Sequence, residues 1–207
     1  MGKRWYLATL LLLCLCALII PSVGNAAEQP VTNYNDQAIA EATNAIVNNA
    51  NDAIAYCKRG RAYFNKSQYD QALIDLNKAI EINPKYAYAY LFRGLTYERK
   101  GQVDLAFEDY NKVIVYDPSY EFGYNNRGSL YNKKGEYDLA IKDFNKAIDL
   151  NPKNPRPYFN KGTAYEKKGL YQEAIEIYRN IITTVAPLDT FVVDSAKVRI
   201  RELGGTI

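Results

Sequence analysis

A repeat of 34 residues is the sequence feature that most limits how this chain can fold. Three residue types recur at that interval, and proline follows the same step until its last occurrence, one residue late. These residues are Gly60, Gly94, Gly128 and Gly162; Tyr63, Tyr97, Tyr131 and Tyr165; Ala72, Ala106, Ala140 and Ala174; and Pro84, Pro118, Pro152 and Pro187. Because one such unit cannot bury its apolar face alone, the period predicts a stack of similar units.

Each unit has the pattern of two helices joined by a short turn. In the second unit, Tyr90 and Tyr97 lie on one helical face, a Lys-Gly turn follows, and a second apolar helical pattern ends at Pro118. A glycine within a helix costs about 1 kcal/mol relative to alanine. Its recurrence inside the first helix therefore predicts that a neighbouring helix approaches too closely for a side chain.

The period, the glycines and the alanines resemble those of the tetratricopeptide repeat family. The resemblance implies an all-α fold, an α-solenoid of antiparallel helix pairs with a right-handed superhelix. Four complete units are expected at residues 53–86, 87–120, 121–154 and 155–187. Residues 27–52 are expected to hold a linker and half a repeat, with a capping helix over 36–49, and residues 188–207 a C-terminal capping helix and tail.

Residues 1–26 have the features of a secretory signal peptide. Lys3 and Arg4 precede an apolar run, and small residues before Ala27 provide a cleavage site. The chain is therefore expected to be exported, periplasmic or secreted. The alternative is a membrane anchor formed by residues 5–23, facing outside the cytoplasm, and only this alternative would place the protein on a membrane. After cleavage Cys57 would be the one cysteine left, which we expect to be a small core or groove residue.

Recurring charges predict ion pairs between helices. A cation precedes each repeat glycine, and an acid recurs in the second helices. If each acid pairs with the cation of the following unit, every acid and cation has a partner, whereas pairing within a unit leaves charges over. We therefore expect pairs between units that fix the stacking register. They are Glu41 with Arg59, Asp75 with Arg93, Asp109 with Arg127 and Asp143 with Lys161.

A second series of cations ends the first helices. We interpret these lysines as complements to the helix dipole, with a basic stripe for an acidic partner as the alternative. The series consists of Lys66, Lys100, Lys134 and Lys168.

Composition argues against an enzyme. The chain has no histidine, which excludes nucleophile pairs that use imidazole and His-ligated metals, and it has no glycine-rich phosphate loop. Its net charge of +3 includes two leader cations and does not indicate nucleic-acid binding. We therefore expect no catalytic residues, no metal and no small-molecule cofactor.

The resemblance implies that first helices line a concave groove that binds a peptide or helix of another protein. An adaptor or scaffold of this kind is the expected function, and self-association through the groove or cap helix is the alternative. The five residues matching the chaperone-carboxylate clamp of some family members include Cys57, Phe92 and Phe122, so that clamp is absent. The expected partner-binding residues are Tyr88, Leu91, Leu95, Arg99, Phe122, Asn125, Asn132, Lys133 and Phe159.

Overall fold

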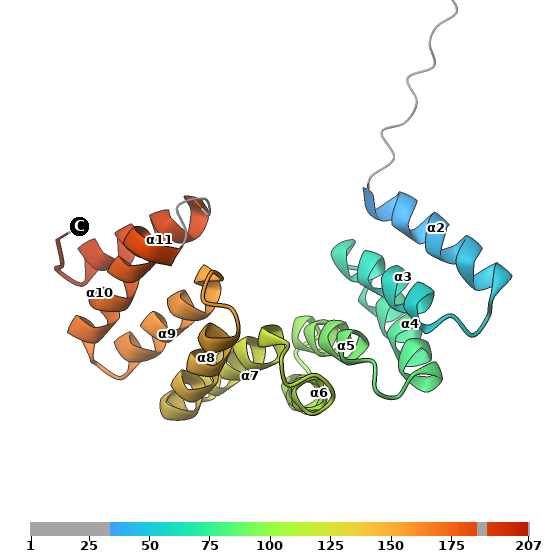
Figure 1. Ribbon diagram of the computed structural model, residues 1–207, viewed down its shortest axis with the longest axis horizontal. Coiled ribbons are helices and arrows are strands. Elements are labelled where there is room, and N and C mark those ends of the chain that lie inside the picture. The colour runs from blue at the N-terminus through green and yellow to red at the C-terminus, as the bar shows by residue number, and fades with distance from the viewer. Residues whose placement is uncertain (1–33, 186–189, 207) are drawn as a thin grey trace, which may run out of the picture. The chain divides into compact units, whose positions relative to one another are not determined.

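The computed structural model describes residues 34–185 and 190–206, and this part of the chain is helical, without strands. The predicted signal peptide lies outside the described residues. Consecutive helices pack as antiparallel pairs, as Figure 1 shows, which confirms the expected α-solenoid. The helices are α2 (Tyr34–Asn48), α3 (Ala53–Asn65), α4 (Tyr69–Ile82), α5 (Ala87–Arg99), α6 (Val103–Tyr116), α7 (Glu121–Lys134), α8 (Tyr137–Leu150), α9 (Pro155–Lys167), α10 (Tyr171–Asn180) and α11 (Thr190–Glu202).

Glycines occur at two places in the hairpins, inside the first helix and, in every hairpin but the first, in the turn. A Cβ on Gly162 of α9 would lie 2.5 Å from Cε1 of Tyr178 on α10, and a Cβ on Gly60 would lie 2.8 Å from Cγ of Leu76 on α4. The close approach predicted from the glycine period is therefore confirmed. The turns between paired helices need a left-handed residue, which is Gly101 in the second hairpin with φ of 75° and Ser67 in the first with φ of 59°.

The late position of Pro187 has a counterpart in the backbone. α10 continues into a π-helical turn at Ile181–Val185. A π turn holds one residue more than an α turn, so it absorbs the one-residue insertion that displaces Pro187 from the 34-residue step. α11 then packs against α10 and α9, with Val192, Ala196 and Ile200 buried.

The arginines before the repeat glycines pair within their own hairpins, so the prediction of pairs between units was wrong. Arg93 binds Asp109 and does not reach Asp75; Arg59 instead holds Asp75 through Nε at 2.7 Å and Nη2 at 2.8 Å. Asp143 is bound by Arg127 and not by the predicted Lys161. These carboxylates are nearly buried between the two helices, where the paired guanidinium compensates their lost hydration.

Each of these arginines reaches the preceding unit with its remaining nitrogen, but the acceptor is neutral. Nη1 of Arg93 donates to Asn77 Oδ1 at 2.8 Å, and Nη1 of Arg127 donates to Asn111 Oδ1 at 2.8 Å. Nη1 of Arg59 donates to Thr43 Oγ1 of α2 at 3.2 Å. The remaining predicted acid, Glu41, is exposed and accepts a hydrogen bond from Gln37.

Ion pairs between units do form, through the lysines that end the first helices. Each of these lysines binds an aspartate in the first turn of the preceding second helix, a role that neither the dipole interpretation nor the basic stripe includes. The pairs are Lys66–Asp36, Lys100–Asp70, Lys134–Asp104 and Lys168–Asp138. Their aspartates are exposed, unlike those held by arginine.

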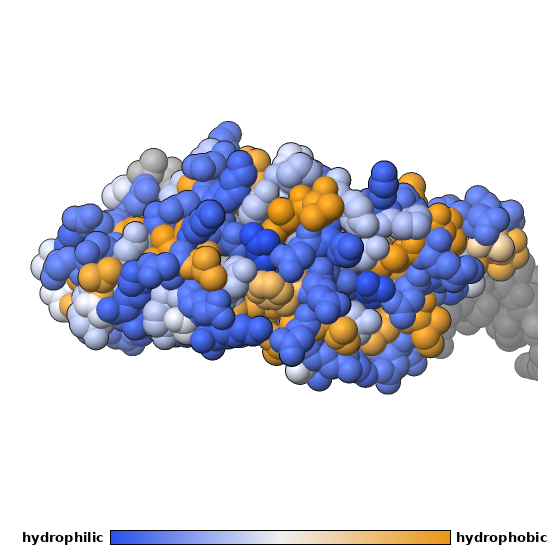
Figure 2. All heavy atoms as spheres, turned by 90° about the horizontal axis from the view of Figure 1, so that it is seen from below, coloured by the Kyte–Doolittle hydropathy of each residue, from blue (hydrophilic) through white to orange (hydrophobic). Residues whose placement is uncertain are grey.

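Several exposed apolar side chains lie on the second helices. Ile74, Leu105, Val115 and Leu139 lie on α4, α6 and α8. On the face seen in Figure 2, hydrophobic residues form small groups separated by hydrophilic ones. Among the described residues, no helix combines the length and apolarity needed to cross a bilayer.

Candidate functional site

Two adjoining hollows run along the first helices and the capping helix. The apolar hollow, of about 360 Å³, lies over α5 and α7 and reaches α9. The polar hollow, of about 870 Å³, extends from α5 to α11. Both are lined by Leu95, Asn125, Asn126 and Arg156, so they form one continuous groove.

Aromatic rings form the wall of the apolar hollow. Tyr88 packs on Phe92 with ring centroids 4.9 Å apart, and Tyr120 packs edge-on against Phe122 at 5.2 Å. Arg61 Nη1 donates to the Tyr88 hydroxyl at 2.8 Å, which fixes that ring. Such packing holds the rings in place, so the hollow is formed before any ligand arrives.

Leu91 contributes less surface than the sequence predicts. It lines the apolar hollow but is only 4% exposed, because it also packs in the core with Tyr110 and Leu130. Leu95 is half-buried and borders both hollows. The groove therefore offers Leu95 to a ligand more fully than Leu91.

A cluster of amides forms the floor where the hollows meet. Asn160 Nδ2 donates to Asn125 Oδ1 at 3.0 Å and to Ser129 Oγ at 3.3 Å. Asn125 Nδ2 in turn donates to Asn126 Oδ1 at 3.2 Å. The amide cluster, Asn125, Asn126 and Asn160, thus leaves Asn126 Nδ2 as a donor and Asn160 Oδ1 as an acceptor for a bound backbone.

Charged side chains surround the polar hollow, with three cations against one carboxylate. Glu98 accepts from Lys133 Nζ and from the Tyr110 hydroxyl, the latter at 3.0 Å. Burial of the Tyr110 hydroxyl, followed by the charge and hydrogen bond of Glu98, raises the pKa of Tyr110 well above its usual range. The other two cations, Arg99 and Arg156, are exposed, and no ion pair among the described residues involves them.

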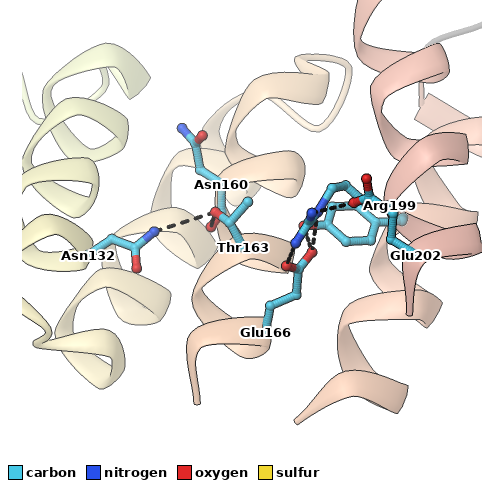
Figure 3. Close-up of polar contacts among 7 residues, drawn as sticks. Asn132, Asn160, Thr163, Glu166, Arg199 and Glu202 are labelled. Atoms are coloured by element: carbon cyan, nitrogen blue, oxygen red, sulfur yellow. Dashed lines mark hydrogen bonds and ion pairs between the residues drawn. The ribbon is translucent and has the colours of Figure 1, made fainter. Parts of the chain in front are cut away.

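A similar arrangement holds the capping helix, two repeats further along, where Glu166 takes the place of Glu98. Glu166 on α9 accepts from Arg199 on α11 and from the Tyr178 hydroxyl, the latter at 2.6 Å. Arg199 also binds Glu202, so it lies between two carboxylates, as Figure 3 shows. Glu166 is the more buried of the two, with 9% of its side chain exposed against 53% for Glu202.

Eight of the nine residues predicted to bind a partner line the two hollows, and Asn132 does not. Asn132 points toward Thr163 in Figure 3, with Nδ2 donating to Thr163 Oγ1 at 3.4 Å. Its Oδ1 is buried and has no hydrogen-bond partner in the described part of the chain. It occupies the place of Glu98 one repeat later, where the facing residue is Phe144 and provides no hydroxyl like that of Tyr110.

Several residues that line the groove are absent from the nine predicted ones, and two of them, Asn160 and Phe191, differ in the sequence signal that could have found them. Asn160 stands 34 residues after Asn126, so the period itself could have revealed the second half of the amide cluster. Phe191 of the cap helix lines the polar hollow and is 80% exposed, and it stands 35 residues after Arg156, one residue beyond the repeat step. Its place depends on how α11 packs after the π turn, which the repeat does not specify.

Cys57 belongs to the core. Its side chain is fully buried beside Ala72 and Leu76, and burial raises its pKa to about 12. A thiol with that pKa is protonated at neutral pH and is a poor nucleophile. Within residues 34–185 and 190–206, no group of three or more acidic or cysteine side chains is placed to hold a metal ion.

Helix hairpins with a continuous groove along their first helices define a helical-repeat protein. Models of the tetratricopeptide repeat match residues 87–120 and 158–185, and a further TPR repeat model matches residues 60–101 and 128–169. The chain therefore belongs to the tetratricopeptide repeat family. Members of this family are typically non-catalytic proteins that bind other proteins.

Solved structures with the same fold include two named proteins. MamA from Desulfovibrio magneticus RS-1, residues 41 to the end, is 20% identical with a TM-score of 0.65, over 75% of this chain and 88% of that chain. YrrB, a TPR protein described as having an unusual peptide-binding site, is 21% identical with a TM-score of 0.62, over 79% of this chain and 84% of that one.

A third structure with this fold is a tetratricopeptide repeat protein from Parabacteroides merdae ATCC 43184. It is 21% identical with a TM-score of 0.67, over 82% of this chain and 67% of that one. No curated protein sequence matches the chain. At these identities the structural likeness establishes the fold.

Proposed function

We propose that this protein is a non-catalytic adaptor that binds an extended segment of another protein in the groove of its first helices, outside the cytoplasm. The observation that carries the proposal is the amide cluster at the junction of the two hollows. Side-chain amides there can pair with the N–H and C=O groups of an extended backbone. The adjoining apolar hollow can then bury a side chain of the same segment, which supplies most of the affinity.

The groove can be tested by comparing captured proteins in the native host. The groove variant is Leu95→Arg with Asn126→Ala, because both residues border the two hollows and neither is fully buried. The matched control is Leu105→Arg with Asn145→Ala, which changes exposed residues of second helices. Circular dichroism and the melting temperature confirm that both variants fold.

A partner that the wild type and the control enrich, and that the groove variant loses, supports the adaptor. If the groove variant captures the same proteins as the wild type, groove binding is wrong. Cross-linking mass spectrometry of the wild-type complex provides a second readout, with the adaptor requiring cross-links from Lys133 beside the polar hollow.

Export rests on the leader sequence, residues 1–26, and has its own test. Mass spectrometry of the protein from the native host should find a mature N-terminus at Ala27 in the fraction outside the cytoplasm. An intact N-terminus in the membrane fraction would instead support the anchor over residues 5–23. An intact protein in the cytoplasm would contradict both.

The cap helix supports self-association as a second candidate function. Phe191 and Val198 of α11 are 80% and 47% exposed, and they line a hollow of about 680 Å³ together with Phe159. Exposed apolar surface of this kind often lies at a protein interface. Sedimentation velocity over a range of concentrations should show dimers that Val198→Asp abolishes, whereas a concentration-independent monomer would contradict this candidate.

A further inference from the structure

Two arginines of the groove differ from the cations that recur at the repeat positions. The arginines before Gly60, Gly94 and Gly128 each bind an aspartate, and the lysines at the first-helix ends bind aspartates of the preceding unit. Arg99 and Arg156 take part in neither series, and no ion pair among the described residues includes them. Both line the polar hollow, so its two uncompensated cations face the space a ligand would fill.

The residues at one helix position show how the groove changes along the array. Tyr88, Phe122 and Arg156 stand 34 residues apart, near the start of α5, α7 and α9. All three line the apolar hollow, and Arg156 also lines the polar one. The groove is therefore aromatic over two successive repeats and cationic at the third.

A ligand that matches this groove needs two chemical groups close together. Its apolar group must fill the hollow between Tyr88, Phe92 and Phe122, whose volume suits an aromatic or large aliphatic side chain. Its anionic group must lie beside Arg156 and Arg99, where a planar guanidinium can bind a carboxylate through two hydrogen bonds. Between them, the amide cluster is placed to bind peptide groups.

We propose that the partner segment is an acidic extended peptide carrying an aromatic or large aliphatic residue, with its carboxylates beside Arg99 and Arg156 and its apolar side chain in the apolar hollow. This inference rests on the proposed groove function and adds the chemistry of the partner. A nucleic acid is a poorer match, because two free arginines neutralise few phosphates and the aromatic rings pack on one another instead of presenting open faces to bases.

Selection from a random linear peptide library displayed on phage tests the chemistry, with the full chain as the immobilised target. Four targets are compared: the wild type, the charge variant Arg99→Glu with Arg156→Glu, the apolar variant Leu95→Arg, and a control with Lys142→Glu and Lys146→Glu. The control makes the same charge change at exposed lysines of α8. Melting temperatures establish that all four fold.

The inference requires peptides that combine Asp or Glu with Phe, Tyr, Trp or Leu to be enriched on the wild type and the control. A synthetic peptide of that kind should bind the charge variant about tenfold or more weakly, with a loss that shrinks at high salt. Selection on the charge variant should favour basic residues in place of the acidic ones. The apolar variant should lose enrichment altogether.

The failure of the inference is distinct from the failure of the proposed function. The inference is wrong if the enriched peptides need Leu95 but lack acidic residues, or if they bind the charge variant as tightly as the wild type. Either result leaves groove binding standing. If no enriched peptide depends on Leu95, both the inference and the proposed function are wrong. Single-stranded DNA that binds the wild type but not the charge variant, with no acidic peptide enriched, assigns the cations to a nucleic acid and also overturns the inference.

Discussion

Arg93 holds Asp109 with two hydrogen bonds, 2.9 Å from Nε and 2.7 Å from Nη2, inside one helix hairpin. Asp109 is only 3% exposed, and burial raises its pKa despite the hydrogen bonds and charge of Arg93. The guanidinium also lies 5.2 Å from the centroid of the Tyr90 ring. The pair therefore ties the two helices of a repeat together at a place that water hardly reaches.

A double-mutant cycle will measure this pair. We expect Asp109→Ala to destabilise the protein by about 3 kcal/mol, because it leaves a guanidinium without its partner in a mostly buried site. Arg93→Met should cost a similar amount, and the double variant should cost less than the sum of the two. Urea unfolding provides the free energies. An equal cycle on Asp75 and Arg93 should give no coupling, and strong coupling there would restore pairing between units.

Substitution at Ser67 will measure how much folding free energy the left-handed turn conformation costs a residue other than glycine. Ser67 occupies the turn with φ of 59° where the next repeat has Gly101 with φ of 75°. We expect Ser67→Gly to stabilise the protein by roughly 0.5 to 1 kcal/mol, because glycine adopts this conformation without a Cβ clash. Gly101→Ser should destabilise by a similar amount. Thermal unfolding checks both, and equal signs for the two changes would refute the explanation.

Glu166 should control how firmly the cap helix is held. We expect Glu166→Gln to weaken the contact with Arg199, because a neutral amide replaces a carboxylate that a guanidinium and a tyrosine both bind. Hydrogen exchange over residues 190–202 should accelerate by about tenfold or more. Glu202→Gln is the control, since Arg199 also binds this exposed carboxylate. Equal exchange in both variants would show that Glu166 does not hold α11.

Cys57 should make stability fall at high pH. Its folded pKa of about 12 lies above its ordinary value of 9.0, so the unfolded chain loses the thiol proton first. The resulting stabilisation is complete below pH 9 and is lost as the pH rises toward 12. Between these values the slope should be about 1.4 kcal/mol per pH unit steeper than in Cys57→Ala. Urea unfolding from pH 8 to 11 measures the slopes, and identical slopes would contradict the prediction.

The architecture could be predicted because one period fixes many contacts at once. Gly162 of one helix lies directly against the Tyr178 ring of the paired helix. The recurrence of the glycine was enough to predict this close approach. The groove followed from the assignment of first helices. The groove residue that failed, Asn132, failed because its neighbours Thr163 and Phe144 differ from those in adjacent repeats, and a period says nothing of such differences.

The ion pairs could not be predicted because a repeat supplies the same partners in both directions. Arg93 has Asp109 after it and Asp75 before it, and only the geometry of the hairpin selects the first. The predicted pairing also gave every charge a partner, whereas the described part of the array contains charges outside any ion pair. Glu41 is exposed to water, and Lys161 lies 5.9 Å from the Tyr165 ring with its pKa lowered by burial.

The two sets of ion pairs give the array a mechanical character that neither set would give alone. Arginine–aspartate pairs are shielded inside hairpins, whereas lysine–aspartate pairs such as Lys100–Asp70 lie in water between hairpins. Salt weakens exposed pairs far more than buried ones. Raising the ionic strength should therefore weaken the contacts between neighbouring hairpins and leave those within each hairpin nearly unchanged. The array should then bend more easily between hairpins at high salt.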